Sequence, residues 1–228
     1  MKHLIITIAI CTIAVAAHAQ KDEMALYRQM FKTADSLKNI GQSSAIDTAE
    51  VYKLAKELDE KHPSEFFNAA SSMLNESKFN AAAFLFYVGE MRFKYYNATN
   101  PNYQASGDGA LYGSLNYVFG EPINMYLRSD IDNMIFILKM AFAYCALNDY
   151  AFHPKEKDIA KYDEIVSKMQ SQLIGDLEAN KLKYAEEFAK LNDDFKNILN
   201  QVDSRMKGGE QQPSTEDDSK AGKKKGKK

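Results

Sequence analysis

The segment from Ser77 to Asn97, SKFNAAAFLFYVGEMRFKYYN, restricts the fold of this chain more than any other. It is the densest apolar run beyond the first nineteen residues, and Glu90, Arg92 and Lys94 interrupt it with charge. A helix that is apolar on nearly every side has to be covered by other elements on more than one side. We therefore predict an all-α fold in which this segment forms a helix packed on both sides by neighbouring helices.

The residues from 63 to 97 have the spacing of a helix, a short turn and a second helix. Large, small and aromatic residues follow one another there in a set order: Phe66, Ala70, Phe79, Ala82, Phe86 and Gly89. This segment resembles one tetratricopeptide or Sel1-like repeat, and residues 110 to 120 are loosely similar to the first helix of a Sel1-like unit. The resemblance implies a fold of helical hairpins whose concave side binds another protein. Because repeat arrays contain several copies and no clean second copy follows, a generic helical hairpin remains the alternative interpretation.

Amphipathic patterns predict helices on the outside of the bundle. One helix spans residues 22 to 40, and a second begins after Asp47, whose side chain suits the N-cap position. Ser129 and Asp132, three residues apart, resemble a capping box for a helix from 130 to 147. That last helix is apolar nearly all round, so we expect it near the centre of the fold.

Glycine and proline concentrate between residues 97 and 132, which we interpret as a polar loop region. The sequence predicts a loop at 106–109, a short helix from about 110 to 119, and a turn at Gly120-Glu121-Pro122. Binding candidates cluster here because tyrosine and arginine are favoured interface anchors and loops frequently carry binding sites. The candidates are Tyr103, Tyr112, Asn116, Tyr117, Glu121, Asn124, Arg128 and Asp130, together with Arg92 from the preceding helix.

Two of these assignments have structural alternatives. The GEPIN segment from Gly120 to Asn124 also fits a plain turn that joins two core helices. Arg92 also fits an inward position against a carboxylate such as Glu121 or Asp130, because buried charges persist only when they are paired.

From residue 155 to 206 the apolar residues recur at steps of three and four, which is the pattern of a coiled-coil seam. An extra step of four, from Leu173 to Leu177, breaks the alternation beside Gly175, so the sequence predicts either two helices in line or one bent helix. The seam needs a partner helix, which is either another helix of this chain or a second copy of the protein. The seam residues are Ile159, Tyr162, Val166, Met169, Leu173, Leu177, Tyr184, Phe188, Leu191, Phe195, Ile198 and Val202.

Both ends of the chain differ in composition from the rest. Residues 1–19 have a basic start, an apolar run and a small-residue end, which predicts a secretory signal cleaved near Ala19 and Gln20 and a periplasmic or extracellular location. Residues 20–206 form the predicted single helical domain, with 21 Lys and Arg against 27 Asp and Glu. The tail, 207–228, contains no apolar residue larger than alanine except one proline, and is predicted to be disordered. Its last lysines suit either a solubilising end or weak contact with an anionic surface: Lys223, Lys224, Lys225, Lys227 and Lys228.

Catalytic motifs are sparse. The predicted domain has two histidines, His62 and His153, each beside a proline and neither at metal-ligand spacing from a carboxylate. It has no HExxH, phosphate-binding loop or GxSxG motif, so we expect no cofactor and no metal, and its net negative charge argues against nucleic acid. The preferred hypothesis is an exported protein-binding module, with a periplasmic immunity or inhibitor protein as its specific form. The alternatives are an envelope-associated structural protein, and an enzyme of unrecognised type that uses Glu121, Arg128 and Asp130.

Overall fold

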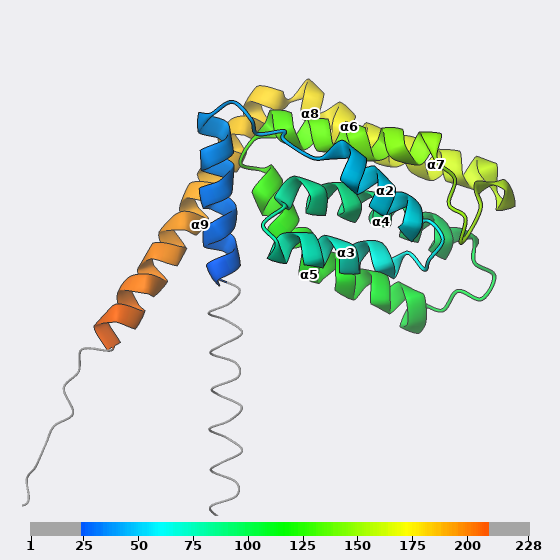
Figure 1. Ribbon diagram of the computed structural model, residues 1–228, viewed down its shortest axis with the longest axis horizontal. Coiled ribbons are helices and arrows are strands. Elements are labelled where there is room, and N and C mark those ends of the chain that lie inside the picture. The colour runs from blue at the N-terminus through cyan, green and yellow to red at the C-terminus, as the bar shows by residue number, and fades with distance from the viewer. Residues whose placement is uncertain (1–23, 210–228) are drawn as a thin grey trace, which may run out of the picture. The chain divides into compact units, whose positions relative to one another are not determined.

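The computed structural model describes residues 24–209 (Figure 1). The predicted signal peptide and the closing lysines of the predicted tail lie outside these residues. Within them the chain is helical and contains no β-strand, which confirms the all-α prediction. The main elements are a helix over residues 24–39, α2 (Thr48–Leu58), α3 (Ser64–Asn75), α4 (Phe79–Thr99), α5 (Ala110–Leu127), α6 (Ile131–Leu147), α7 (Ile159–Gln170), α8 (Asp176–Ala179) and α9 (Lys181–Gly209).

The described residues divide into two compact units, 24–193 and 194–209. The second unit is the C-terminal part of α9, and the first contains all the other elements. α9 continues to Gly209, two residues beyond the point at which the predicted tail begins.

α4 is the central helix of the first unit, as its sequence predicts. Every residue from Phe79 to Phe93 is buried, and α4 packs against α2, α3, α5, α6 and α7 (Figure 1). Burying a large apolar side chain contributes about 1.5–3 kcal/mol, so this one helix supplies much of the core. Both charged residues of the buried stretch are paired. Glu90 lies 2.6 Å from Lys94, and Arg92 lies 2.9 Å from Asp59.

α3 and α4 form the predicted helical hairpin, and small residues let the two helices approach closely. A Cβ atom at Gly89 would lie 2.5 Å from the Cβ of Phe66, closer than two side chains can come. Ala70 and Ala82 are fully buried. In the turn between the helices, Ser77 has a φ of 59°, a left-handed conformation that costs a non-glycine residue about 1–2 kcal/mol. The predicted packing is confirmed, whereas membership of a repeat family stays a prediction.

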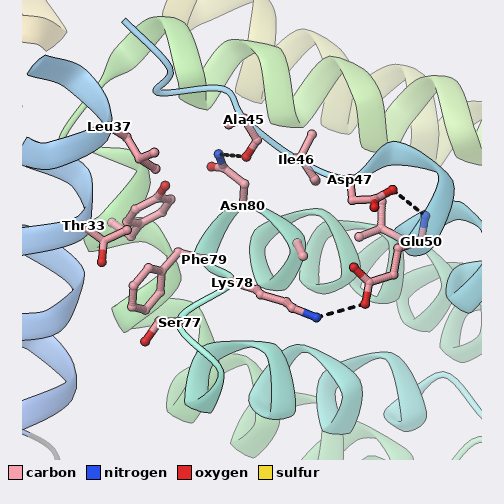
Figure 2. A pocket seen from close by; sticks show the side chains of 13 residues that line it. Thr33, Leu37, Ala45, Ile46, Asp47, Glu50, Ser77, Lys78, Phe79 and Asn80 are labelled. Carbon is pink, nitrogen blue, oxygen red and sulfur yellow. Dashed lines mark hydrogen bonds and ion pairs between the residues drawn. The ribbon is translucent and has the colours of Figure 1, made fainter. Parts of the chain in front are cut away.

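Asn80, at the start of α4, ties the connection before α2 to the core. Its amide nitrogen donates to the carbonyl oxygens of Ser43 at 2.8 Å and Ala45 at 2.9 Å, and Figure 2 shows the second of these bonds. Its amide oxygen accepts a hydrogen bond from Asn133 Nδ2 at 2.8 Å. α2 then begins at Asp47, which is its N-cap as predicted, since its carboxylate accepts a backbone N–H of the first turn at 2.9 Å.

The predicted turn at Gly120-Glu121-Pro122 is wrong, because α5 runs through Pro122 as one helix. Proline removes one backbone hydrogen bond, to the carbonyl oxygen of Val118. Val118 lies on the exposed side of the helix, where water can satisfy that oxygen. Most residues from Ile123 to Leu127 are buried, and their burial stabilises the continued helix.

The C-terminal segment is divided into several helices. A wide turn, Ser171–Gly175, follows α7 at the place where the seam pattern breaks, and Asn180 separates α8 from α9. α7 packs on α4 and α8 packs on α6. In this part of the seam the partner helices therefore belong to the same chain. The buried seam residues here are Tyr162, Met169 and Leu177.

Candidate functional site

The solvent-facing side of α5 is exposed and almost free of charge. Tyr117 is 77% exposed, Val118 57% and Leu111 40%. Among the residues of α5, only Glu121 is charged, although surface helices ordinarily present charged residues to water. We call this surface the α5 outer face. It consists of Ala110, Leu111, Gly113, Ser114, Tyr117, Val118 and Glu121.

Three of the predicted binding residues lie on or beside this face. Tyr117 and Glu121 belong to it, and Tyr103 is exposed at the beginning of α5. The phenol of Tyr103 lies directly over Gly109, where any side chain would collide with the ring. Asn116, the next residue of the predicted set, is half-buried at the edge of the face.

Tyr112 and Asn124 point to the opposite side and fasten α5 to α4. The Tyr112 hydroxyl donates to Glu90 Oε1 at 3.2 Å, and Glu90 also pairs with Lys94. The Tyr87 hydroxyl donates to Asn124 Oδ1 at 2.5 Å. Burial, reinforced by the nearby Glu90 carboxylate, raises the pKa of both Tyr87 and Tyr112, so both phenols stay protonated. These two candidates therefore position α5.

Arg128 and Asp130 hold the junction of α5 and α6. Arg128 Nε donates to the carbonyl oxygen of Asn124 at 3.2 Å, in the last turn of α5. Asp130 Oδ1 accepts two backbone N–H groups from the first turn of α6, at 3.0 and 3.1 Å, which makes Asp130 the N-cap. The predicted capping box of Ser129 and Asp132 is wrong, because the neighbouring carboxylate occupies the capping position.

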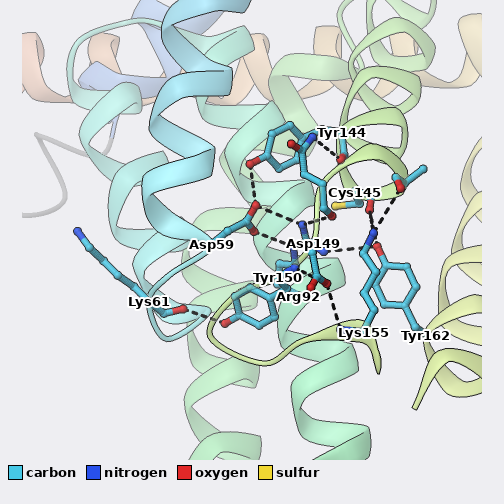
Figure 3. Close-up of polar contacts among 11 residues, drawn as sticks. Asp59, Lys61, Arg92, Tyr144, Cys145, Asp149, Tyr150, Lys155 and Tyr162 are labelled. Carbon is cyan, nitrogen blue, oxygen red and sulfur yellow. Dashed lines mark hydrogen bonds and ion pairs between the residues drawn. The ribbon is translucent and has the colours of Figure 1, made fainter. Parts of the chain in front are cut away.

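Arg92 is fully buried, which corrects its assignment as a binding candidate. Its carboxylate partner is Asp59 at the C-terminal end of α2, and neither Glu121 nor Asp130 takes that position (Figure 3). Arg92 Nε donates to Asp59 Oδ1 at 2.9 Å and Nη2 donates to Oδ2 at 3.3 Å. This paired geometry on two almost fully buried side chains indicates a structural role.

A polar network surrounds this ion pair (Figure 3). The Tyr144 hydroxyl donates to Asp59 Oδ2 at 2.7 Å, and Arg92 Nη2 donates to the carbonyl oxygen of Asn148 at 3.0 Å. The guanidinium also lies over the ring of Tyr150, 5.2 Å from its centroid. Burial raises the pKa of the Asp59 carboxyl, while Arg92 and then Tyr144 act in the opposite direction. The network joins α2, α4, α6 and the connection that follows α6.

Cys145 lies beside this network and is chemically protected. Its carbonyl oxygen accepts hydrogen bonds from the Tyr162 hydroxyl at 2.7 Å and Lys155 Nζ at 2.8 Å. Burial raises the pKa of its thiol to about 11. The thiolate is the nucleophilic form, so Cys145 is not an activated nucleophile.

Ser64, His62 and Asp108 resemble a Ser-His-Asp arrangement. His62 Nδ1 lies 2.8 Å from Ser64 Oγ, and Nε2 lies 3.5 Å from Asp108 Oδ1. However, His62 Nδ1 also accepts the backbone N–H of Ser64 at 3.3 Å, so the imidazole caps the start of α3. The next two N–H groups donate to the carbonyl oxygens of His62 and Pro63, which leaves neither of them free to stabilise an oxyanion. The geometry is that of a histidine that is hydrogen-bonded to the first turn of α3, and it does not favour Ser-His-Asp catalysis at these three residues.

In residues 24–209, no group of three or more His, Cys, Asp or Glu side chains has an arrangement that could hold a metal ion. None of the helices in the described part of the chain combines the length and the apolar character that a membrane span needs. Comparison of the chain with known protein families, with curated proteins and with solved structures found no match.

The sequence did not identify the aliphatic and small residues of the α5 outer face, which are Ala110, Leu111, Gly113, Ser114 and Val118. The signal was present, because residues 110 to 120 contain no charge at all. All of these residues lie inside the helix predicted over residues 110 to 119. The sequence alone does not show which side of that helix α3 and α4 cover, so it does not show that these residues share one exposed surface.

Proposed function

We propose that the protein is an exported protein-binding module whose partner docks on the α5 outer face. The observation that carries this proposal is the exposure of Tyr117, Val118 and Leu111 on a face with a single charge. Exposed apolar patches on folded proteins frequently mark interaction sites. Tyrosine is also among the residues that contribute most binding energy at interfaces.

The inner side of α5 supports this proposal because it holds the face in place. The bonds from Tyr112 to Glu90 and from Tyr87 to Asn124 attach α5 to α4. Gly120 lies so close to α4 that a Cβ atom there would be 3.1 Å from the ring of Phe86. A surface that is already ordered loses little entropy when a partner binds.

The form of the face favours a partner that packs an extended or helical segment along α5. A Cβ atom at Gly113 would meet no atom within 4 Å, so the strip beside Tyr117 is open. The acidic composition of residues 20–206 favours a partner with a basic rim around its apolar contact. A periplasmic immunity or inhibitor protein directed against a basic effector is the specific form of this proposal.

A binding comparison with matched variants tests it. The full chain is used as bait in an envelope extract of the source organism, beside the variant Tyr117→Ala/Val118→Ala. The control is Leu147→Ala, which removes an apolar side chain that is 83% exposed at the end of α6. We expect a stoichiometric partner that the wild type and the control retain and the double variant loses. Retention by the double variant, or a folded bait with no partner, contradicts the proposal.

A second candidate function, self-association in the cell envelope, rests on α9. Leu191 and Ile198 are seven residues apart in the predicted seam and are 50% and 54% exposed. An apolar seam left exposed on a helix is suited to a second copy of that helix. Sedimentation equilibrium should then show a dimer that Leu191→Ser/Ile198→Ser dissociates, and a monomer at high concentration removes this candidate.

A further inference from the structure

A pocket of about 190 Å³ lies where the helix over residues 24–39, the start of α2 and the start of α4 meet (Figure 2). Packed cores contain few voids larger than a water molecule. A cavity of about 150 Å³ lined by apolar side chains is large enough to bind benzene. The pocket therefore has room for one aromatic ring or one branched aliphatic group.

The inner wall of the pocket is apolar. Val51, Phe79, Ala81 and Tyr126 line it and are almost fully buried. The ring centroids of Phe79 and Tyr126 are 5.1 Å apart, so the two rings pack on each other. Leu37 faces these residues from the helix over residues 24–39 (Figure 2). Such a lining favours an apolar group over water.

Hydrogen bonds fix the walls of the pocket. Asn80 ties the connection before α2 to α4 through two carbonyl oxygens. Lys78 Nζ lies 2.9 Å from Glu50 Oε1, and this ion pair joins the turn before α4 to α2 (Figure 2). A pocket whose walls are already tied together does not have to be ordered by its ligand.

The rim of the pocket is negative. Asp47 and Glu50 line it with Lys78, and Lys78 also pairs with Glu76 at 3.1 Å. One ammonium group is thus shared between two carboxylates, and Asp47 adds a third. A ligand group that emerges from the pocket meets this excess negative charge and is favoured when it is positive.

We propose that the pocket binds a small primary amine that carries one aromatic ring or one branched aliphatic group. The apolar group occupies the space between Val51, Phe79 and Tyr126, and the ammonium lies at the rim near Asp47 and Glu50. This site is separate from the α5 outer face and does not depend on the proposed function.

An NMR titration of the full chain tests this site with three matched probes: 2-phenylethylamine, the anion 3-phenylpropionate and the neutral alcohol 2-phenylethanol. Ile46 and Val51 both line the pocket, so we expect 2-phenylethylamine to give saturable shifts of their methyl groups. The binding of 3-phenylpropionate should be at least about tenfold weaker because the rim repels it. Equal affinity for the amine and the anion, or no shift of these methyl groups with the amine, overturns the proposal.

Two variants separate the apolar and the charged parts of the site. Ala81→Leu fills the pocket and is expected to abolish binding of all three probes. Asp47→Asn keeps a good N-cap for α2 but removes the charge, so it should weaken amine binding about fivefold and leave 2-phenylethanol binding unchanged. Asp163→Asn, at an exposed position of α7, is the control and should change neither. Amine binding that survives both Ala81→Leu and Asp47→Asn in folded protein places the ligand elsewhere and refutes the assignment.

Discussion

The buried ion pair between Asp59 and Arg92 gives the strongest stability prediction. In Asp59→Asn the neutral side chain has nearly the same shape, but the Arg92 guanidinium keeps its charge at a site where its side chain is 0% exposed. Arg92 would lose its charge-assisted bonds to Asp59 and retain those to the carbonyl oxygen of Asn148 at 3.0 Å and the Tyr162 hydroxyl at 3.4 Å. Removing one partner of a buried pair costs about 3–5 kcal/mol. That is a large share of the roughly 5–15 kcal/mol that stabilises a typical protein.

Urea unfolding followed by circular dichroism measures this cost. The double variant Asp59→Asn/Arg92→Met removes both charges, so it should be less destabilised than the sum of the two single variants by about 2 kcal/mol or more. Glu164→Gln breaks the exposed pair with Lys161 and should cost less than about 1 kcal/mol. A free-energy cost of Asp59→Asn no larger than that of this control, or two single effects that simply add, would contradict the predicted coupling between Asp59 and Arg92.

Three further predictions concern packing and protonation. Gly89→Ala should destabilise the fold by about 1–3 kcal/mol, because its Cβ would lie 2.5 Å from the Cβ atom of Phe66 in α3. Gly113→Ala should instead stabilise the fold by about 0.5–1 kcal/mol, because its Cβ would have no other atom within 4 Å. Urea unfolding of the two variants compares these free energies. Burial raises the pKa of Cys145 to about 11, so a thiol reagent should label Cys145 only upon unfolding, and rapid labelling at Cys145 in the native protein, located by peptide mass spectrometry, would contradict its burial. Burial, and secondly the charge of Lys157, lower the pKa of His153 below 6.5. The unfolded chain gains this proton first, so stability should fall as the pH drops below 6.5, and thermal melts of His153→Gln should lack that part of the decrease.

Elements set by local signals could be predicted from the sequence. Gly41 ends the helix over residues 24–39 with a φ of 68°, a conformation that glycine adopts freely, and Asp47 caps α2. α4 could be recognised as central because a helix with no polar side has to be buried all round. Each of these features depends on residues within a few positions of one another.

The features that depend on distant residues could not be predicted. Gly120 and Pro122 are local helix breakers, yet α5 continues because Gly120 packs against Phe86 and Pro122 is buried. Asp59 lies 33 residues from Arg92 in a polar segment of the sequence, so nothing local identifies it as the partner. For the same reason Tyr112 and Tyr117 are both predicted as binding residues from the sequence alone. In the fold, Tyr112 points towards Glu90 and Tyr117 is exposed to solvent.

Site-specific photocrosslinking shows directly whether the α5 outer face binds a protein. The photoreactive residue p-benzoylphenylalanine replaces Tyr117 in one protein and Leu147 in another, so both probes stand at exposed positions but only the first lies on the face. After irradiation in cells of the source organism, we expect a discrete protein adduct from position 117 and none from position 147. No adduct from position 117, or the same adducts from both positions, would contradict protein binding at the α5 outer face.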